Sequence, residues 1–247
     1  GALARLVLVE VALAGLLVQQ TVYPTAELRR AFVANDLVNL VIGVPILLIA
    51  LGLTRQSKLI GLLFWPGALF FVVYNAIAYV YALPAGWPLL LYLILLALAV
   101  YTLIAVLAGI DSGAVRDRLA GKAPERLAGG VLVSLGVLFL LRGVGVLAGS
   151  DDIPRSELSV LTADFLTIPA WIIGGALLWR GQALGYVAGV GLLFQASMLF
   201  VALIAVLLVQ PVLTGAPSSP ADIAVIALFG LVCFVPFALF TRQVIKA

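Results

Sequence analysis

The fourth apolar run of the chain, residues 89–110, reads LLLYLILLALAVYTLIAVLAGI and contains no charged side chain. A transmembrane helix needs about 20 consecutive, largely apolar residues to cross the hydrocarbon core of a bilayer. This run is therefore predicted to span a membrane as a helix. Seven further runs are predicted as spans, at residues 2–20, 31–53, 59–83, 130–149, 159–179, 184–209 and 221–241.

The composition of the whole chain indicates that lipid surrounds it. Its 247 residues are 64% hydrophobic and 10% charged, with a mean hydropathy of +1.25. An ordinary soluble domain is roughly half apolar and about a quarter charged. We therefore predict an all-α integral membrane protein with about eight transmembrane helices. The first apolar run is similar to a signal-peptide core, but no small-residue cleavage motif follows it, so we interpret it as a span.

Two segments, one in each half of the chain, share a pattern. The first, YPTAEL at residues 23–28, precedes Asp36 and an apolar run with an internal proline and a terminal arginine. The second, IPRSEL at residues 153–158, precedes Asp164 and a run of the same kind. The features keep the same order, and the offset between them drifts only from 130 to 125 residues. This similarity predicts an internal repeat.

The repeat divides the chain into three parts. Residues 1–110 are predicted as the first four-helix repeat, 111–129 as a linker and 130–247 as the second four-helix repeat. Because each repeat contains an even number of spans, both have the same orientation. A pseudo-two-fold axis along the membrane normal then relates them.

The distribution of Lys and Arg predicts the orientation. With a cytoplasmic N-terminus, ten of these side chains fall on the cytoplasmic side and three on the opposite side, as the positive-inside rule describes. Both termini and the linker then lie in the cytoplasm. We expect the protein to be integral to a bacterial cytoplasmic membrane. We expect its partners to be the lipid bilayer and either other membrane subunits or further copies of the chain. The net charge of +3 is explained by the excess of Lys and Arg in the cytoplasmic loops, so we expect no nucleic-acid binding.

The absence of histidine excludes several kinds of site. The chain has no His, one Cys (Cys233) and one Met (Met198). Haem ligation by His, His-containing zinc sites, copper centres and disulfides are therefore almost excluded, and a Ser-His-Asp or Cys-His catalytic unit is impossible. No Walker-type Gly-Lys-Ser/Thr sequence is present. We expect neither a metal nor a cofactor.

Two aspartates in matching places are the main candidate site residues. At a helix rise of ~1.5 Å per residue, Asp36 and Asp164 lie near the outer membrane boundary or slightly within it. An ionisable group at that depth usually faces a bundle interior or an aqueous cavity. Asn39 and Thr167 follow three residues later on the same helical faces. We predict that all four bind substrate, although interfacial carboxylates solvated by headgroup water would produce the same pattern.

The third span of the first half adds further polar side chains. Tyr74 and Asn75 join the predicted substrate-binding set, and Tyr79 shares a helical face with Asn75. The matching part of the second half is less polar, with Gln195 and Ser197. We therefore expect the first half to line any polar cavity. Tyr79 is also consistent with an aromatic belt at the membrane interface.

Two opposite charges fall inside predicted spans, Glu10 in the first and Arg142 in the fifth. The repeat places them at nearly equal depths, and pairing is the usual way to hold charge within a bilayer. We predict an inter-repeat ion pair that joins the halves or acts as a transporter gate. Arg5 or water is the alternative partner of Glu10.

Glu27 and Glu157 each follow a proline placed like a first-turn helix residue. An acidic side chain in the first turn complements the helix dipole. Helix initiation therefore explains both glutamates.

Three functions fit these observations. The first, which we rank ahead, is a carrier or transporter of a small solute or lipid-like molecule, with an acidic site near the outer face. The second is a structural or accessory subunit of a larger membrane complex. The third is a membrane-embedded lipid or isoprenoid enzyme with Asp36 and Asp164 as acid and base. The lack of catalytic motifs weighs against the enzyme.

Overall fold

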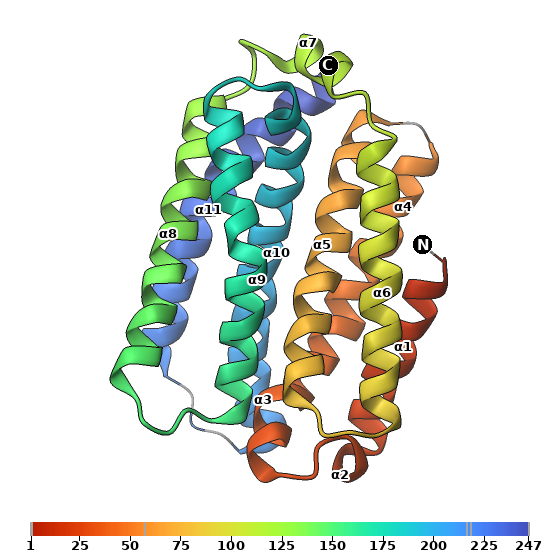
Figure 1. The fold of residues 1–247 in the computed structure, drawn as a ribbon, viewed down its shortest axis with the longest axis vertical. Helices are drawn as coiled ribbons and strands as arrows, with labels where there is room; N and C mark the ends of the chain where they lie inside the picture. The colour runs from red at the N-terminus through yellow and green to blue at the C-terminus, as the bar shows by residue number, and fades with distance from the viewer. Residues whose placement is uncertain (1, 57, 216, 218, 247) are drawn as a thin grey trace.

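The computed structural model is a bundle of long helices (Figure 1). It describes residues 2–56, 58–215, 217 and 219–246, with side chains from residue 6 onward. Every regular element among these residues is a helix. They are α1 (Ala2–Leu17), α2 (Gln19–Val22), α3 (Ala26–Val38), a π-helical segment η1 (Asn39–Gly43), α4 (Val44–Arg55), α5 (Leu59–Ala82), α6 (Trp87–Ala108), α7 (Ser112–Leu119), α8 (Glu125–Gly149), α9 (Arg155–Trp179), α10 (Ala183–Thr214) and α11 (Pro220–Lys246).

Seven helices in the described part of the chain are long and apolar enough to cross a membrane. One of them is the continuous helix Ala26–Arg55, made of α3, η1 and α4; the others are α5, α6, α8, α9, α10 and α11. The chain is therefore all-helical, as an all-α membrane protein requires. The first predicted span corresponds to α1, which is apolar but has only 16 residues. Figure 1 shows α1 beginning partway along the bundle, so the number eight stays a prediction.

The π-helical segment η1 lies directly before Pro45, which occupies the first turn of α4. Proline has no N–H to donate and its ring clashes with the carbonyl four residues earlier. A single widened turn accommodates both effects without breaking the helix. The corresponding helix α9 stays α-helical through Pro169. The sequence shows an internal proline in each of these two helices, which does not by itself predict a π-helical turn.

Buried apolar side chains form two clusters, one drawn mainly from α1–α6 and one mainly from α7–α11. We call residues 2–110 the first half and 130–246 the second half. Helix pairs in one half have counterparts in the other: α5 packs on α4 and α6, as α10 packs on α9 and α11. Likewise α1 packs on α6, and α8 on α11. Between the halves, α5 contacts α10, α5 contacts α9, and α10 contacts α3.

The halves approach closely where α5 meets α10, at Gly67 and Gly191. A Cβ on Gly67 would lie 2.2 Å from the carbonyl oxygen of Gly191, and a Cβ on Gly191 would lie 3.2 Å from the nitrogen of Gly67. Small residues permit such backbone contact between helices. The two glycines are 124 residues apart, as are Gly61 and Gly185. Gly61 packs on backbone atoms of Leu53 and Thr54, near the end of α4. Gly185 likewise packs on backbone atoms of Leu177 and Leu178, near the end of α9.

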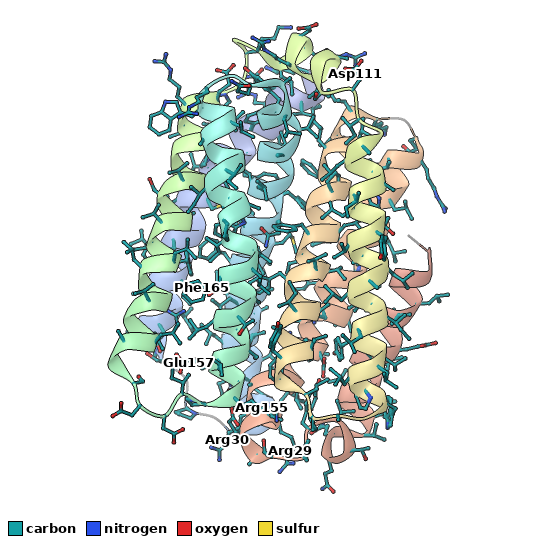
Figure 2. The ribbon with its side chains drawn as sticks, in the orientation of Figure 1. Arg29, Arg30, Asp111, Arg155, Glu157 and Phe165 are labelled. Atoms are coloured by element: carbon teal, nitrogen blue, oxygen red, sulfur yellow. The ribbon has the colours of Figure 1, made fainter. Side chains whose placement is uncertain are left out.

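The two ends of the bundle differ. Figure 2 shows Arg29, Arg30, Arg155 and Glu157 at one end, which we call the α2 end, and Asp111 at the other, the α7 end. Helix α7 lies within the predicted linker and was not predicted as a helix. Its Val115 and Leu119 are buried, while its charged side chains are exposed. It therefore lies across the ends of the long helices with one apolar face inward.

Candidate functional site

Asp36 is completely buried inside the first half. Three phenols surround its carboxylate. Tyr23 donates a hydrogen bond to Oδ2 at 2.5 Å, while Tyr79 and Tyr92 donate to Oδ1 at 2.7 and 3.4 Å. A carboxylate in an apolar interior needs such donors because its surroundings supply no water. We call these four residues the Asp36 cluster.

The connection between α2 and α3 and the helix α1 complete the enclosure. The carbonyl of Tyr23 accepts a hydrogen bond from Arg29 Nη1 at 2.8 Å, which fixes the connection. Burial raises the pKa of the Tyr23 hydroxyl well above its usual value of 10.0, so the hydroxyl keeps its proton and donates. On α1, a Cβ at Gly15 would lie 1.8 Å from Oδ2 of Asp36. Only glycine fits at that position.

Asn35 extends the Asp36 cluster toward the boundary between the halves. Its Nδ2 donates to the hydroxyl of Tyr79 at 2.9 Å and to Oδ1 of Asn75 at 3.2 Å. The hydroxyl of Tyr79 in turn donates to Asp36. A continuous hydrogen-bonded path therefore runs from Asn35 through Tyr79 to Asp36.

This path begins at a cavity of about 220 Å³ between the two halves, which we call the interface cavity. It lies between α3, α5, α9 and α10, toward the α2 end. Its polar lining comes from both halves, and the rest of its wall is apolar. The polar residues are Asn35, Tyr74, Asn75 and Ser156.

Asp164 lies on α9 and is turned toward the first half. Its Oδ1 accepts a hydrogen bond from Tyr74 of α5 at 3.0 Å, and Tyr74 lines the interface cavity. Arg142 stands on the neighbouring helix α8, next to Gly143, which packs on Leu161 and Phe165 of α9. The cavity therefore touches Tyr74, the partner of Asp164, and is linked to Asp36 through Asn35 and Tyr79.

The predicted substrate-binding residues occupy three kinds of place. Tyr74 and Asn75 line the interface cavity. Asp36 and Asp164 lie behind its wall, each joined to it by hydrogen bonds. Asn39 and Thr167 are buried one turn further along their helices, and the Thr167 hydroxyl donates to the carbonyl of Ala163 at 2.7 Å.

The structure does not bring Glu10 and Arg142 together. Both side chains are exposed, and Figure 1 shows α1 and α8 at opposite edges of the bundle. The sequence pattern predicts the depth of each residue but not the side of the bundle on which its helix stands. Arg142 lies near Asp164 instead. The side chain of Arg5, the alternative partner of Glu10, lies outside the described residues.

Glu27 makes a contact that helix initiation did not predict. It lies in the first turn of α3, and its Oε1 accepts a hydrogen bond from the backbone N–H of Ser156, in the first turn of α9, at 2.7 Å. Two further bonds join the halves at this end. Arg155 Nη2 donates to the carbonyl of Leu83 at 3.1 Å, and Gln210 Nε2 donates to that of Arg30 at 2.8 Å. We call these three bonds the rim contacts.

Sequence reasoning missed Gly15, Tyr23 and Asn35 as site residues. Tyr23 directly precedes Pro24 of the shared pattern, and Asn35 directly precedes Asp36. Their positions in the sequence could therefore have indicated both as site residues. Gly15 had none, because the need for a missing side chain appears only when α1 packs on Asp36. Gln195, from the less polar second half, accepts a bond from Trp171 Nε1 at 2.6 Å away from the cavity.

Among the described residues, no group of three or more His, Cys, Asp or Glu side chains could hold a metal ion. Comparisons of the chain with protein-family models, with curated proteins and with solved structures found no match. The chemistry of the site therefore has to be inferred from its carboxylates, phenols and amides, which bind by hydrogen bonds and can carry protons.

Proposed function

We propose that this chain is a membrane carrier for a small solute or a lipid-like molecule that binds in the interface cavity. The observation that carries the proposal is the position of this cavity between the halves, where hydrogen bonds link its polar lining to both aspartates. Tyr74 connects it to Asp164. Asn35 connects it, through Tyr79, to Asp36.

In this proposal the halves are two tandem four-helix repeats in parallel orientation, with α1 as the eighth span. The matching helix pairs support the repeat, as do Gly67 and Gly191, which meet each other as equivalent residues near a pseudo-two-fold axis should. The excess of Lys and Arg supports a cytoplasmic α7 end. Carriers of this construction bind substrate near the boundary between repeats.

The lining of the interface cavity favours a small amphipathic ligand. Amide and phenol groups of Asn35, Tyr74 and Asn75 offer hydrogen bonds, while Val160 and Leu199 belong to the apolar wall. The volume of about 220 Å³ lies below the roughly 300–1,000 Å³ of drug-sized pockets. A molecule with one or two hydrogen-bonding groups and a short hydrocarbon part would satisfy both surfaces.

The rim contacts close the cavity toward the α2 end. All three join the first half to the second, and two of them end on backbone carbonyls. Access from this end requires the halves to separate there, as in the rocking of one repeat against the other. Loss of the Glu27 contact should therefore favour the open form.

Cysteine accessibility in proteoliposomes tests the proposal. Cys233, the single cysteine, is buried, and replacing it with serine gives a background for Ala78→Cys in the cavity wall. A carrier exposes its site to each side in turn. A membrane-impermeant maleimide should therefore label Ala78→Cys from the α2 side when the carrier is open to that side. It should label the same residue from the α7 side when the carrier is open to the α7 side.

The matched control is Ala99→Cys, a completely buried alanine on α6, which should remain unlabelled. Adding Glu27→Gln should increase labelling of Ala78→Cys from the α2 side at least severalfold. Labelling from one side only would contradict a carrier and favour an enzyme. Labelling from neither side would favour a structural subunit.

A further inference from the structure

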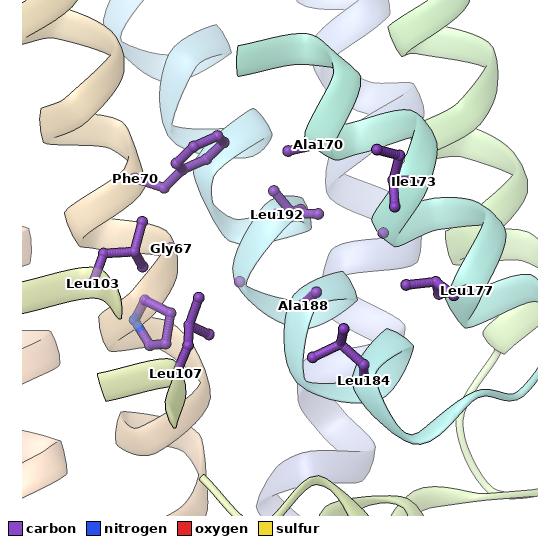
Figure 3. A pocket seen from close by; sticks show the side chains of 13 residues that line it. Gly67, Phe70, Leu103, Leu107, Ala170, Ile173, Leu177, Leu184, Ala188 and Leu192 are labelled. Atoms are coloured by element: carbon purple, nitrogen blue, oxygen red, sulfur yellow. The ribbon is translucent and has the colours of Figure 1, made fainter. Parts of the chain in front are cut away.

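A second cavity, of about 300 Å³, lies on one flank of the bundle between α5, α6, α9 and α10 (Figure 3). Every residue that lines it is apolar, including Phe70, Leu107 and Leu177. Two further lining residues, Ile173 and Leu184, have 62% and 54% of their surface exposed. In a membrane, this flank faces hydrocarbon, so the cavity is open sideways to lipid.

A smaller cavity of about 190 Å³ lies closer to the α7 end. Leu59 and Leu62 of α5 line the smaller cavity, and Pro66 and Phe70 of the same helix line the larger one. The spacing of i, i+3, i+7 and i+11 places all four on one face of α5. Both cavities therefore lie along the same helix face.

Helix α6 leads to the same conclusion. Leu103 and Leu107 line the larger cavity, and Ile110, two residues beyond the end of α6, lines the smaller one. The two cavities follow each other along the same faces of α5 and α6, and we call them together the α5–α6 groove. From Leu59 to Phe70 it extends ~16 Å along the helix axis. That length is about half of a hydrocarbon core of roughly 30 Å, or one leaflet.

The polar end of the groove carries two charged side chains of opposite sign, Arg118 and Asp111. Arg118 is exposed on α7, and a guanidinium group suits the bidentate binding of phosphate oxygens. Asp111 caps α7, with its Oδ1 accepting from the N–H of Ala114 at 3.0 Å. A carboxylate accepts more than one hydrogen bond, so Asp111 can also bind a primary ammonium group.

We propose that the α5–α6 groove binds one phospholipid with a phosphoethanolamine headgroup. An acyl chain occupies the apolar part, the phosphate binds Arg118 and the ammonium group binds Asp111. The length of the groove, its purely apolar inner part and the paired charges at its end each match one part of that molecule. This site is at the opposite end of the bundle from the rim contacts and does not depend on the carrier proposal.

Native mass spectrometry of the purified full chain tests the site. The probe is an equimolar mixture of phosphatidylethanolamine, phosphatidylcholine and phosphatidylglycerol with identical acyl chains. One phosphatidylethanolamine should be retained at least about fivefold over the others, because only it pairs a phosphate with an ammonium that donates hydrogen bonds. Equal retention of the three lipids, or preference for phosphatidylglycerol, would overturn the proposal.

Two variants separate the headgroup contacts. Arg118→Gln should reduce retention of all three lipids at least about fivefold. Asp111→Asn should remove only the preference for phosphatidylethanolamine, since asparagine still caps the helix. Arg116→Gln, an exposed change on the same helix outside the groove lining, is the matched control and should change nothing. Unaltered retention by Arg118→Gln would refute the phosphate contact.

A third variant tests the acyl chain. Ala188→Phe places a ring in the larger cavity and should abolish retention of every lipid. Leu141→Phe, on the exposed face of α8, adds a ring away from the groove and should leave retention intact. Normal binding by Ala188→Phe would show that the lipid does not occupy the groove.

Discussion

Asp36 and Asp164 each follow a Pro-x-x-Glu-Leu segment, yet their surroundings differ. Asp36 is completely buried, and its three phenol partners all come from its own half. Asp164 is 7% exposed, and its phenol partner Tyr74 comes from the opposite half. Asp36 thus helps to hold one half together, whereas Asp164 connects one half to the other.

Neighbouring residues explain the difference. The 124-residue offset that relates Gly67 to Gly191 relates Tyr79 to Leu203, so the second half has no phenol at that place. An offset of 128 residues relates Asp36 to Asp164 and Gly15 to Gly143. A Cβ on Gly143 would meet the ring of Phe165 at 3.0 Å rather than a carboxylate. If the two halves are repeats, as proposed, the same position serves two roles because its neighbours differ.

The largest expected effect comes from breaking the enclosure of Asp36. Gly15→Ala should lower the free energy of unfolding by about 3 kcal/mol, because its Cβ overlaps a carboxylate held by three hydrogen bonds. Gly145→Ala, with no atom within 4 Å of its Cβ, is the control and should be neutral or slightly stabilising. Denaturation in mixed micelles measures both. Equal stability of the two variants would show that α1 does not pack on Asp36 as described.

A direct comparison of the aspartates should give intermediate effects. Asp36→Asn should cost about 2 kcal/mol of unfolding free energy, since it weakens hydrogen bonds from three phenols to a charged acceptor. Asp164→Asn should cost about 1 kcal/mol, with one such bond affected. The same denaturation measurement applies. A larger loss for Asp164→Asn would reverse the roles assigned to the two residues.

The smallest expected effect is the coupling of Arg142. Arg142→Gln should cost no more than about 0.5 kcal/mol by itself, because a long basic side chain near the end of a membrane-spanning helix can extend its charge to the interface. A double-mutant cycle should nevertheless show coupling with Asp164→Asn and none with Glu10→Gln. Strict additivity with Asp164→Asn, together with coupling to Glu10→Gln, would support the ion pair between halves that the sequence predicted.

Much of the helical layout could be predicted from the sequence, because an apolar run of sufficient length has few alternatives in a membrane. Seven predicted spans correspond to long apolar helices. Helix α7 was missed because its eight residues carry three charges and too few apolar positions to produce a clear period. The π-helical turn before Pro45 was missed because sequence indicates that a proline disturbs a helix, not how the helix responds.

Spacing along the helices predicts the depth of the candidate site in the membrane but not the direction in which its side chains point. Spacing along a helix indicates how deep Asp36, Asp164 and Tyr74 lie, and the structure does place Tyr74 beside Asp164. Which way each side chain points depends on how the helices are arranged around one another. For that reason the sequence predicts an ion pair between Glu10 and Arg142, although their helices stand at opposite edges of the bundle.

The contact between Gly67 and Gly191 has a mechanical consequence. Two helices that meet through bare backbone have no interlocking side chains at that point, so they can tilt against each other without unpacking a core. Gly67 lines the apolar cavity on one side, and Tyr74, ~10 Å further along α5, lines the interface cavity. The crossing would thus act as a fulcrum: a tilt that widens the space at Tyr74 narrows the space beside Leu184, which lines the apolar cavity on the other side of the crossing.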